Sequence, residues 1–357
     1  MKLRPRTLLT FALGFLALTA AHAAEVAANH PAFRYIGRFD QTDPAGPRCT
    51  WSASSVAFTI TGGSAYVKLK DSGKNLWQVV INGEPTSVLK LEAGEQTYPV
   101  AAALPPGKHL IELVKRTEAN LGATQILGFE TSGDVQLLPT PARPRRIEVI
   151  GDSITCGYGN EAPNKEAKFS PETENAWLTY GAVAARAVNA DYVSIAWSGK
   201  KLWPDNTIVS LYDRVAPNVS GTAKWDFTQW TPDVVVINLG TNDFNAKVNP
   251  DEAGWTAAYV KFIAEIRARY PKAVIYCAVG PMISNWPGDR KPRETILGYF
   301  GKIIPEANAA GGPPVRLLDL GVQAEHHGIG AQWHPSVKTH SIMAGKLTAA
   351  LKADIGW

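Results

Sequence analysis

Cysteine is scarce in this sequence, with three residues in a chain of 357. Three cysteines cannot all pair within one chain, so disulfide bonds cannot form the main scaffold. Cys277 lies in an apolar, β-branched run and is predicted to be a buried thiol. A bridge between Cys49 and Cys156 stays open as an alternative. The sequence is therefore not that of a disulfide-stapled protein.

Several motifs that would indicate bound nucleotides or metals are also missing. The patterns G-x-x-x-x-G-K-[ST], G-x-S-x-G and H-E-x-x-H do not occur. Residues 157–162 match G-x-G-x-x-A, but Gly157 lies several residues past the end of a strand-like run, and Pro163 follows. In a dinucleotide fingerprint the first glycine closes the strand directly, so that a helix N-terminus meets the pyrophosphate. We therefore expect no nucleotide, metal or other cofactor.

A large excess of charge of one sign is missing as well. The whole chain has 36 Lys and Arg against 32 Asp and Glu, a net charge of +4. The first 23 residues hold three basic side chains and no acidic one, which leaves 33 basic against 32 acidic residues, or +1, for the rest. Neither nucleic acid nor a membrane is therefore expected as a partner.

The first 23 residues have the features of a secretory signal peptide. Lys2, Arg4 and Arg6 precede an apolar run over 8–18, and Ala21-His22-Ala23 forms a small-x-small cleavage site. The apolar run is shorter than the ~20 residues of a membrane-spanning helix, and no later stretch is long and apolar enough to span. We expect cleavage near Ala23 and secretion to the periplasm or the cell exterior.

The length of the chain predicts two domains, the first over residues 33–138. Residues 64–70 alternate between apolar and polar side chains, and Asn82-Gly83 separates two β-rich runs in the manner of a hairpin. A further strand-like run, 107–116, begins with a turn. Several short strands separated by turns indicate a β-sandwich, which we expect to be jelly-roll-like.

Three prolines make residues 139–146 a stiff linker, and an α/β domain is predicted over 147–357. Short apolar runs that read as strands recur at 145–152, 191–197, 233–240, 273–280 and 315–321. Helical patterns alternate with them, at 174–189, 255–270 and 336–353. Repeated βα units with continuous apolar strands predict a parallel sheet flanked by helices.

Residues with catalytic chemistry follow three of these predicted strands, where ligands bind in such folds. Ser153 comes directly after the first strand, although a serine at this place is also a common helix N-cap. A serine nucleophile needs a base and donors for the oxyanion. His334 precedes Pro335, which favours an extended and accessible backbone, and Gly199 and Asn242 offer N–H groups at the other two strand ends.

The order Gly-Asp-Ser, strand-end Gly, Gly-Thr-Asn-Asp and late His-Pro resembles the SGNH hydrolase superfamily. The strings RRIEVIGDSITCGYGNE, AWSGK and NLGTNDF look like carbohydrate esterase family two, as do GRF, DPAGPR, VKRTEA and LLPTPARP in the first domain. The resemblance covers nearly the whole chain after the signal peptide. It implies an SGNH-type α/β fold and metal-free removal of acetyl groups from plant cell-wall polysaccharides, such as acetylated xylan and glucomannan, through an acetyl-enzyme.

The resemblance also implies a role for each matching residue. Ser153 matches the nucleophile and His334 the base. Gly199 and Asn242, together with the backbone N–H of Ser153, match the donors to the oxyanion. Two acidic neighbours, Asp152 and Asp243, are expected to brace the loops that carry Ser153 and Asn242. For Asp152 a simple loop cap stays open as the alternative.

The acid of a Ser-His-Asp triad is missing from its usual place. Family members often carry an Asp two or three residues before the histidine, where this chain has Gln332 and Ala331. Some group must still hold the tautomer of the imidazole. We expect a Ser153–His334 dyad whose Nδ1–H is held by a main-chain carbonyl or by the Gln332 side chain, with Glu325 as a more distant alternative.

Tryptophan is frequent, with 11 residues, and its flat face suits stacking on pyranose rings. Trp286 and Trp333 are the preferred candidates for binding an acetylated polysaccharide or oligosaccharide, followed by Trp197 and Trp203. The first domain is expected to form one wall of the cleft, with a carbohydrate-binding module as the alternative. The oligomeric state is not indicated by the sequence.

Two other functions stay open at this point. A polysaccharide-binding protein with vestigial catalysis would not need all four of Ser153, Gly199, Asn242 and His334. An SGNH esterase acting on lipid or peptidoglycan acyl groups is the second alternative, although no apolar lid segment is found.

Overall fold

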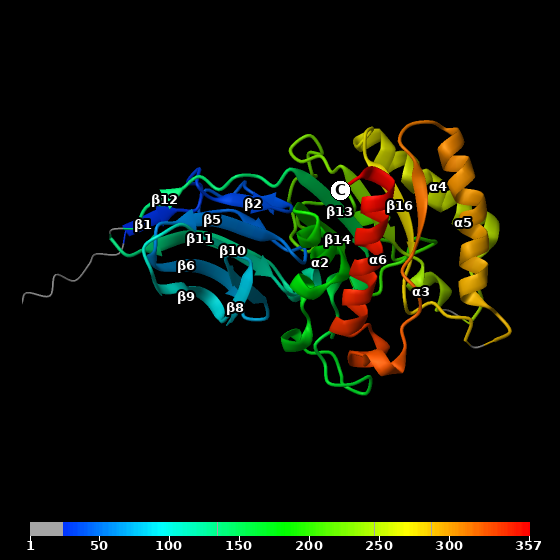
Figure 1. The fold of residues 1–357 in the computed structure, drawn as a ribbon, viewed down its shortest axis with the longest axis horizontal. Coiled ribbons are helices and arrows are strands. Elements are labelled where there is room, and N and C mark those ends of the chain that lie inside the picture. The colour runs from blue at the N-terminus through cyan, green and yellow to red at the C-terminus, as the bar shows by residue number, and fades with distance from the viewer. Residues whose placement is uncertain (1–23, 134, 246, 287) are drawn as a thin grey trace, which may run out of the picture.

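The computed structural model describes residues 24–357 except for positions 134, 246 and 287. The predicted signal peptide therefore lies outside the described residues. A β domain and an α/β domain lie end to end in Figure 1, with the blue and cyan strands at one end and helices α4 and α5 at the other. This arrangement agrees with the predicted fold class, a β-sandwich followed by a parallel sheet flanked by helices.

Two antiparallel sheets form the β domain. One has the order β3-β4-β11-β6-β9 with β1 on β11, and the other has the order β12-β5-β10-β7-β8 with β2 on β5. The strands are β1 Ala24–Ala27, β2 Arg34–Ile36, β3 Phe39–Asp40, β4 Arg48–Cys49, β5 Ser55–Ile60, β6 Gly63–Ser72, β7 Leu76–Ile81, β8 Glu84–Lys90, β9 Ala93–Leu104, β10 His109–Lys115, β11 Thr124–Thr131 and β12 Leu137–Leu138.

The side chains of these strands follow the expected alternation. Val67 and Leu69 of β6 are buried, whereas Lys68 and Lys70 are exposed. Apolar residues of both sheets form one core between them, with Phe58 of β5 among its members. The predicted hairpin joins β7 to β8, and its residues Asn82 and Gly83 both have positive φ, as a tight two-residue turn requires.

The α/β domain contains one parallel sheet of order β14-β13-β15-β16-β17. Its strands are β13 Arg145–Gly151, β14 Ala190–Ala196, β15 Val234–Asn238, β16 Val274–Val279 and β17 Val315–Asp319. The chain leaves β13 to one side and then crosses to the other. This reversal opens a crevice beyond the carboxyl ends of β13 and β15, the place where doubly wound sheets bind ligands.

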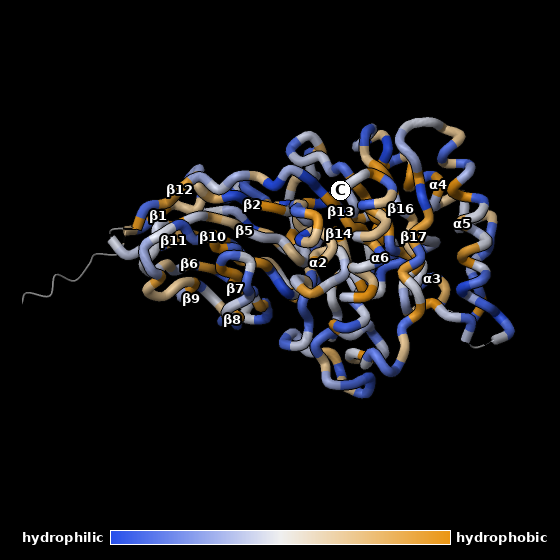
Figure 2. The backbone as a smooth tube through the Cα atoms, in the orientation of Figure 1, coloured by the Kyte–Doolittle hydropathy of each residue, from blue (hydrophilic) through white to orange (hydrophobic). Residues whose placement is uncertain are grey.

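Helices cover both faces of this sheet. Helices α2 Tyr180–Ala187 and α6 Val337–Ile355 pack on the face that holds Val149. Helices α4 Glu252–Arg269 and α5 Pro292–Ala309 pack on the face that holds Ile237. Two short helices, α1 Ser153–Cys156 and α3 Thr241–Phe244, follow β13 and β15 directly. In Figure 2 orange runs along much of this sheet, in agreement with the full burial of β15 and the burial of most of β13 and β16. The edge strand β17 is partly exposed.

Several boundaries differ from the predicted ones. Strand β1 pairs with β11, so the first sheet starts before residue 33. Strand β13 starts at Arg145 and pairs there with β14, so the linker ends two residues earlier than predicted. Helix α5 was not predicted from the sequence, because Gly298, Gly301 and Pro305 lie inside it and disfavour a helical interpretation. The predicted helix over 174–189 is a 3₁₀ turn, Ala176–Leu178, followed by α2.

All three cysteines are buried free thiols. The alternative of a Cys49–Cys156 bridge is therefore wrong, and the expected burial of Cys277 is confirmed. Between residues 24 and 357, apart from the three undescribed positions, no helix is long and apolar enough to cross a membrane.

The interface between the two domains contains a buried ion pair. Arg38 of the β domain and Glu148 of β13 lie 3.4 Å apart, and each is 1% exposed. Glu148 also accepts hydrogen bonds from the hydroxyls of Tyr212, at 2.7 Å, and Tyr270, at 3.4 Å. The Arg38 guanidinium donates to the Tyr212 carbonyl and lies 5.1 Å from the centre of the Tyr212 ring. The pair thus joins the two domains inside a cluster of aromatic residues.

We expect Arg38→Met to destabilise the protein strongly, because it leaves the buried Glu148 carboxylate without its cation. Breaking a buried pair in this way costs about 3–5 kcal/mol. The free energy of unfolding, measured by denaturant titration, tests this. Lys302→Met is the matched control, since Lys302 pairs with Glu252 at the surface and should change the stability little. An unchanged denaturation midpoint for Arg38→Met would contradict the expectation.

Candidate active site

The predicted nucleophile lies at the crevice between β13 and β15. Ser153 is the first residue of α1, and Asp152 caps the helix by accepting the Ile154 N–H at 3.0 Å. The first N–H groups of a helix have no acceptor within it, which leaves the Ser153 N–H as a donor at the strand end. Gly151 must be a glycine, because a Cβ there would lie 2.1 Å from Thr155 Oγ1. Asp152 is thus the N-cap of α1, and its bracing of the Ser153 turn stays a prediction.

Ser153 and His334 are in direct contact. His334 Nε2 lies 2.8 Å from Ser153 Oγ. Its Nδ1 lies 3.0 Å from the carbonyl oxygen of Ala331 and 3.2 Å from that of Gln332. Carbonyl oxygens only accept hydrogen bonds, so Nδ1 carries the proton and Nε2 is free to accept the serine proton. The arrangement is that of a nucleophile with its general base.

The predicted alternatives for holding the imidazole can now be separated. The Gln332 side chain accepts a hydrogen bond from the Tyr158 hydroxyl at 2.5 Å. The Glu325 carboxylate pairs with Lys165 at 2.6 Å, on the protein surface. In the described part of the chain, the partners of His334 Nδ1 are the two main-chain carbonyls. The geometry is therefore that of a dyad, with the backbone in place of a carboxylate.

A close approach between two loops places these carbonyls. Gln332 and Trp333 both have left-handed φ values, of 49° and 68°, which are uncommon for residues other than glycine. The Ala331 N–H donates to the Gly159 carbonyl at 3.0 Å. A Cβ on Gly159 would lie 2.4 Å from Ala331, and one on Gly330 would lie 2.4 Å from the Gly159 oxygen. Gly159 and Gly330 thus let the two loops pack closely against each other.

The environment of His334 favours its neutral form. Burial lowers the pKa of the imidazole below its usual value, and the hydrogen bonds to the Ala331 and Gln332 carbonyls oppose this shift only in part. The Tyr158 ring lies against the imidazole, with ring centres 4.3 Å apart, and against Phe169 on its other side, at 4.4 Å. A neutral imidazole near pH 7 is the form that a general base requires.

The predicted oxyanion donors lie on the two neighbouring loops. Gly199 has φ +77°, and a Cβ there would have no atom of a residue other than its chain neighbours within 4 Å. Gly199 is not among the residues that line the cavity over Ser153, so its role as an oxyanion donor stays a prediction. The Asn242 side chain donates from Nδ2 to the Lys200 carbonyl at 2.9 Å and approaches Asp152 Oδ2 at 3.4 Å. Nδ2 has two hydrogens, and these two contacts use both of them, the contact with Asp152 being the longer. The role of Asn242 as an oxyanion donor therefore stays a prediction.

Two buried carboxyl groups hold these loops. Asp243 accepts N–H groups from Leu202 at 3.2 Å and Trp203 at 3.0 Å, and the indole N–H of Trp255 at 2.9 Å. It therefore ties α3 to the loop that carries Gly199, somewhat beyond the bracing of Asn242 that was predicted. Burial, reinforced by the charge of Asp243, raises the pKa of Asp152 to about 7.

A cavity of about 460 Å³ opens over the dyad. Its lining includes Ser153, His334 and Asn242 together with residues that sequence reasoning had not singled out, namely Tyr158, Thr241, Phe244, Asn245, Met282, Ile283, Ser284, Arg290 and Pro292. Most come from loops, where the sequence shows no periodic signal that could have marked them. Tyr158 lay within the rejected nucleotide motif.

The four predicted tryptophans have different surroundings. Trp286 is 83% exposed and lines the cavity. Trp333 is 53% exposed, and its ring lies 4.2 Å from the Lys165 ammonium. Trp197 and Trp203 are partly buried and pack against the hydrophobic core. Of the four candidates, Trp286 lines the cavity, whereas Trp333, Trp197 and Trp203 do not. In the described residues no group of three His, Cys, Asp or Glu side chains could hold a metal ion.

Two family models match the chain. Residues 35–141 match the model "Carbohydrate esterase 2 N-terminal", and residues 149–342 match the "GDSL-like Lipase/Acylhydrolase family" model. Together they cover both domains.

Curated proteins and solved structures are similar over most of the chain. The "Cellulase/esterase CelE" of Acetivibrio thermocellus is 40% identical over 92% of this chain, but the match spans only 40% of that relative's length. An "Acetylxylan esterase / glucomannan deacetylase" of Cellvibrio japonicus is 27% identical over 93% of this chain and 91% of the relative. The structure of a family two carbohydrate esterase from Clostridium thermocellum superposes with a TM-score of 0.85, at 40% identity, over 99% of that chain.

The lowered pKa of His334 predicts the pH dependence of ester hydrolysis. The base must be neutral, so kcat/KM should rise with pH through a value below 6.5 and be level at neutral pH. The pH profile of kcat/KM with a chromogenic acetate ester measures this. An acid limb centred above pH 7 would show that the imidazole is stabilised in its charged form, as beside a hidden carboxylate.

The carbonyl contacts of His334 predict a small effect of Gln332→Ala. The substitution removes the contact with Tyr158 but keeps both carbonyls, so kcat should fall by less than about tenfold, far below the ~10⁴ that follows loss of a triad acid. Steady-state kinetics at pH 7 test this, with Glu325→Gln as a control that should leave kcat unchanged. A loss approaching ~10⁴ for Gln332→Ala would mean that its side chain orients the base.

Proposed function

This chain belongs to carbohydrate esterase family 2, and we propose that it removes O-acetyl groups from acetylated plant cell-wall polysaccharides, xylan or glucomannan, through an acetyl-enzyme. Its class, a hydrolase of carboxylic esters, follows from the family. The substrate is the proposed part. We further propose that the chain is secreted, as the sequence features of its first 23 residues favour.

One observation carries the reaction type. The 2.8 Å contact between Ser153 Oγ and His334 Nε2, with Nδ1 held by carbonyls, prepares the serine to attack an ester. His334 takes the serine proton while Ser153 Oγ bonds to the acetyl carbon. The oxyanion that forms is stabilised by the N–H groups of Ser153 and Gly199 and by the Asn242 amide.

The same groups complete the cycle. His334 gives its proton to the sugar oxygen, which leaves as a hydroxyl, and an acetyl-enzyme remains on Ser153. Water then loses a proton to His334 and attacks the acetyl carbon, and acetate leaves as Ser153 recovers its proton.

The cavity supports an acetylated sugar chain as the substrate. Its lining is rich in hydroxyl and amide groups, contributed by Tyr158, Thr241, Asn245 and Ser284, which can bind sugar hydroxyls. The exposed ring of Trp286 offers a flat face for a pyranose. The named activity of the Cellvibrio japonicus relative on acetylxylan and glucomannan supports the same substrate class.

Binding of an unacetylated glucan is a second candidate function of the same cavity. The family 2 esterase from Clostridium thermocellum, 40% identical to this chain, has been solved with cellohexaose. Competition by cellohexaose for acetate release from acetylated xylan would support this candidate, and the absence of inhibition at millimolar concentration would exclude it.

We expect acetate release from acetylated xylan and glucomannan, and little or none from acetylated peptidoglycan or long-chain esters. Ser153→Ala should abolish the release while the protein stays folded, because the remaining groups cannot form the acetyl-enzyme. Acetate assays with this substrate panel, together with the melting temperatures of both proteins, test the proposal. A folded Ser153→Ala variant that keeps substantial activity would exclude Ser153 as nucleophile, and release from peptidoglycan alone would exclude the proposed substrate class.

A further inference from the structure

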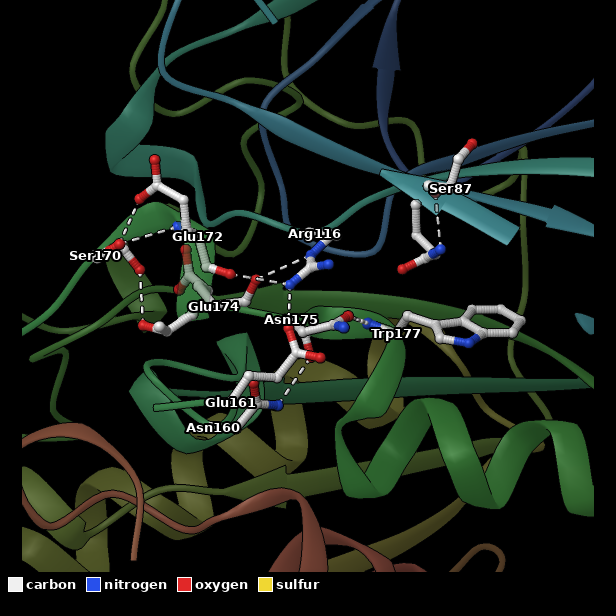
Figure 3. Close-up of polar contacts among 11 residues, drawn as sticks. Ser87, Arg116, Asn160, Glu161, Ser170, Glu172, Glu174, Asn175 and Trp177 are labelled. Carbon is white, nitrogen blue, oxygen red and sulfur yellow. Dashed lines mark hydrogen bonds and ion pairs between the residues drawn. The ribbon is translucent and has the colours of Figure 1, made fainter. Parts of the chain in front are cut away.

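The segment that follows β10 belongs to the β domain and contacts loops of the α/β domain. The Arg116 guanidinium binds the Glu161 carboxylate and donates to the carbonyls of Glu172, at 3.2 Å, and Glu174, at 3.3 Å. Figure 3 shows these contacts with the loop that leads to Asn175. The Arg116 carbonyl in turn accepts the Ala176 N–H at 3.0 Å. This segment is therefore fixed to the α/β domain by both main-chain and side-chain bonds.

Glu118, two residues further on, brings a carboxylate from the β domain to the active-site loops. It is 0% exposed. Its Oε2 accepts the backbone N–H of Ser198 at 2.8 Å and lies 3.8 Å from the Cys156 sulfur, a weak donor. Its own N–H donates to Glu174 Oε2 at 2.9 Å.

The two groups that Glu118 contacts belong to the predicted catalytic elements. Cys156 is the last residue of α1, the helix that begins at Ser153. Burial raises the pKa of its thiol well above the usual value, so the thiol keeps its proton. Ser198 directly precedes Gly199, the predicted oxyanion donor. One carboxylate thus contacts both the helix of the nucleophile and the loop of the oxyanion donor.

The loop that carries Gly199 is held at two points. Asp243 binds the N–H groups of Leu202 and Trp203 from the α/β domain. Glu118 binds the N–H of Ser198 from the β domain. Because a hydrogen bond is stronger inside a protein than in water, these two anchors fix the part of the loop between them, which includes Gly199.

We propose that Glu118 is a positioning residue for ester hydrolysis, which sets the Gly199 N–H against the oxyanion although it belongs to the β domain. The inference rests on the proposed catalytic function of Ser153. A misplacement of about 1 Å in a catalytic group can cost ~10² in rate, so loss of this anchor lowers kcat without removing a group that touches the substrate. KM stays nearly constant, because Glu118 does not line the cavity.

Substitutions that change the length of the side chain at position 118, or its ability to accept a hydrogen bond, distinguish a positioning role of Glu118 from a general structural one. Burial raises the pKa of the Glu118 carboxyl, while the Ser198 hydrogen bonds and Lys115 oppose that shift. Glutamine has the same length and an amide oxygen that can accept the Ser198 N–H. Aspartate is shorter by one methylene and cannot reach it without a shift of the chain. The order of kcat is therefore wild type, Glu118→Gln, Glu118→Asp, with Glu118→Ala at or below the last.

The test measures kcat and KM for a chromogenic acetate ester in these three variants, with melting temperatures. Glu148→Gln is the matched control, because Glu148 is another fully buried carboxylate at the domain interface but contacts Arg38 and two tyrosines. We expect Glu118→Ala to lose about 10- to 100-fold in kcat, less than the ~10²–10³ for complete removal of an oxyanion donor. Glu118→Gln should recover most of this, and Glu148→Gln should lose thermal stability but keep kcat.

Each outcome decides the proposal. A folded Glu118→Ala or Glu118→Asp variant with kcat within about twofold of wild type would overturn it, as would an equal loss of kcat in Glu148→Gln. If Glu118→Ala does not fold, the comparison of Glu118→Gln with Glu118→Asp still decides. Failure of the proposed esterase function would appear differently, as a wild-type protein that is itself inactive.

Discussion

The hydrogen bonds from His334 Nδ1 to two main-chain carbonyls are the constraint on which the active site depends. A triad acid can adjust through its own rotamers, whereas a carbonyl moves only with the backbone that carries it. The loop must therefore hold an unusual path, with left-handed residues at Gln332 and Trp333. That path is stabilised from outside by the Gly159 carbonyl, which accepts the Ala331 N–H. The position of His334 beside Ser153 thus depends on the packing of the loop at residues 158–160 against the loop at residues 330–334.

The neutral acceptors have a chemical consequence for the rest of the site. A carbonyl fixes the tautomer but stabilises an imidazolium less than a carboxylate does. The negative charge of the oxyanion is stabilised separately, by the predicted oxyanion donors. The structure holds the loops of these donors with buried carboxyl groups, Asp243 from one domain and Glu118 from the other. Donors on rigid loops are already in place when the oxyanion forms. They therefore stabilise it without the cost of reorganising the loops.

Much of this organisation could be predicted from local sequence patterns, and the rest could not for physical reasons. The five parallel strands and Ser153 follow from apolar runs and from what stands at their ends. Helix α5 was not predicted, because the glycines and the proline inside it lower the helix propensity of the segment. The sequence left the acceptor for His334 undecided, because any residue supplies a carbonyl and only the fold selects one. The roles of Tyr158 and Glu118 were not predicted, because their partners Gln332 and Ser198 lie 174 and 80 residues away in the chain.

The path of the chain after β10 has a consequence for protein engineering and for evolution. Arg116 and Glu118 belong to the β domain but form hydrogen bonds with loops of the α/β domain. The linker therefore separates the two domains in the sequence, but residues on its two sides are bonded to each other. Recombination at residues 139–144 would join a foreign sandwich to this catalytic half without supplying these bonds. Exchange of the N-terminal sandwich alone would therefore remove the bonds that Arg116 and Glu118 make to the loops of the catalytic half.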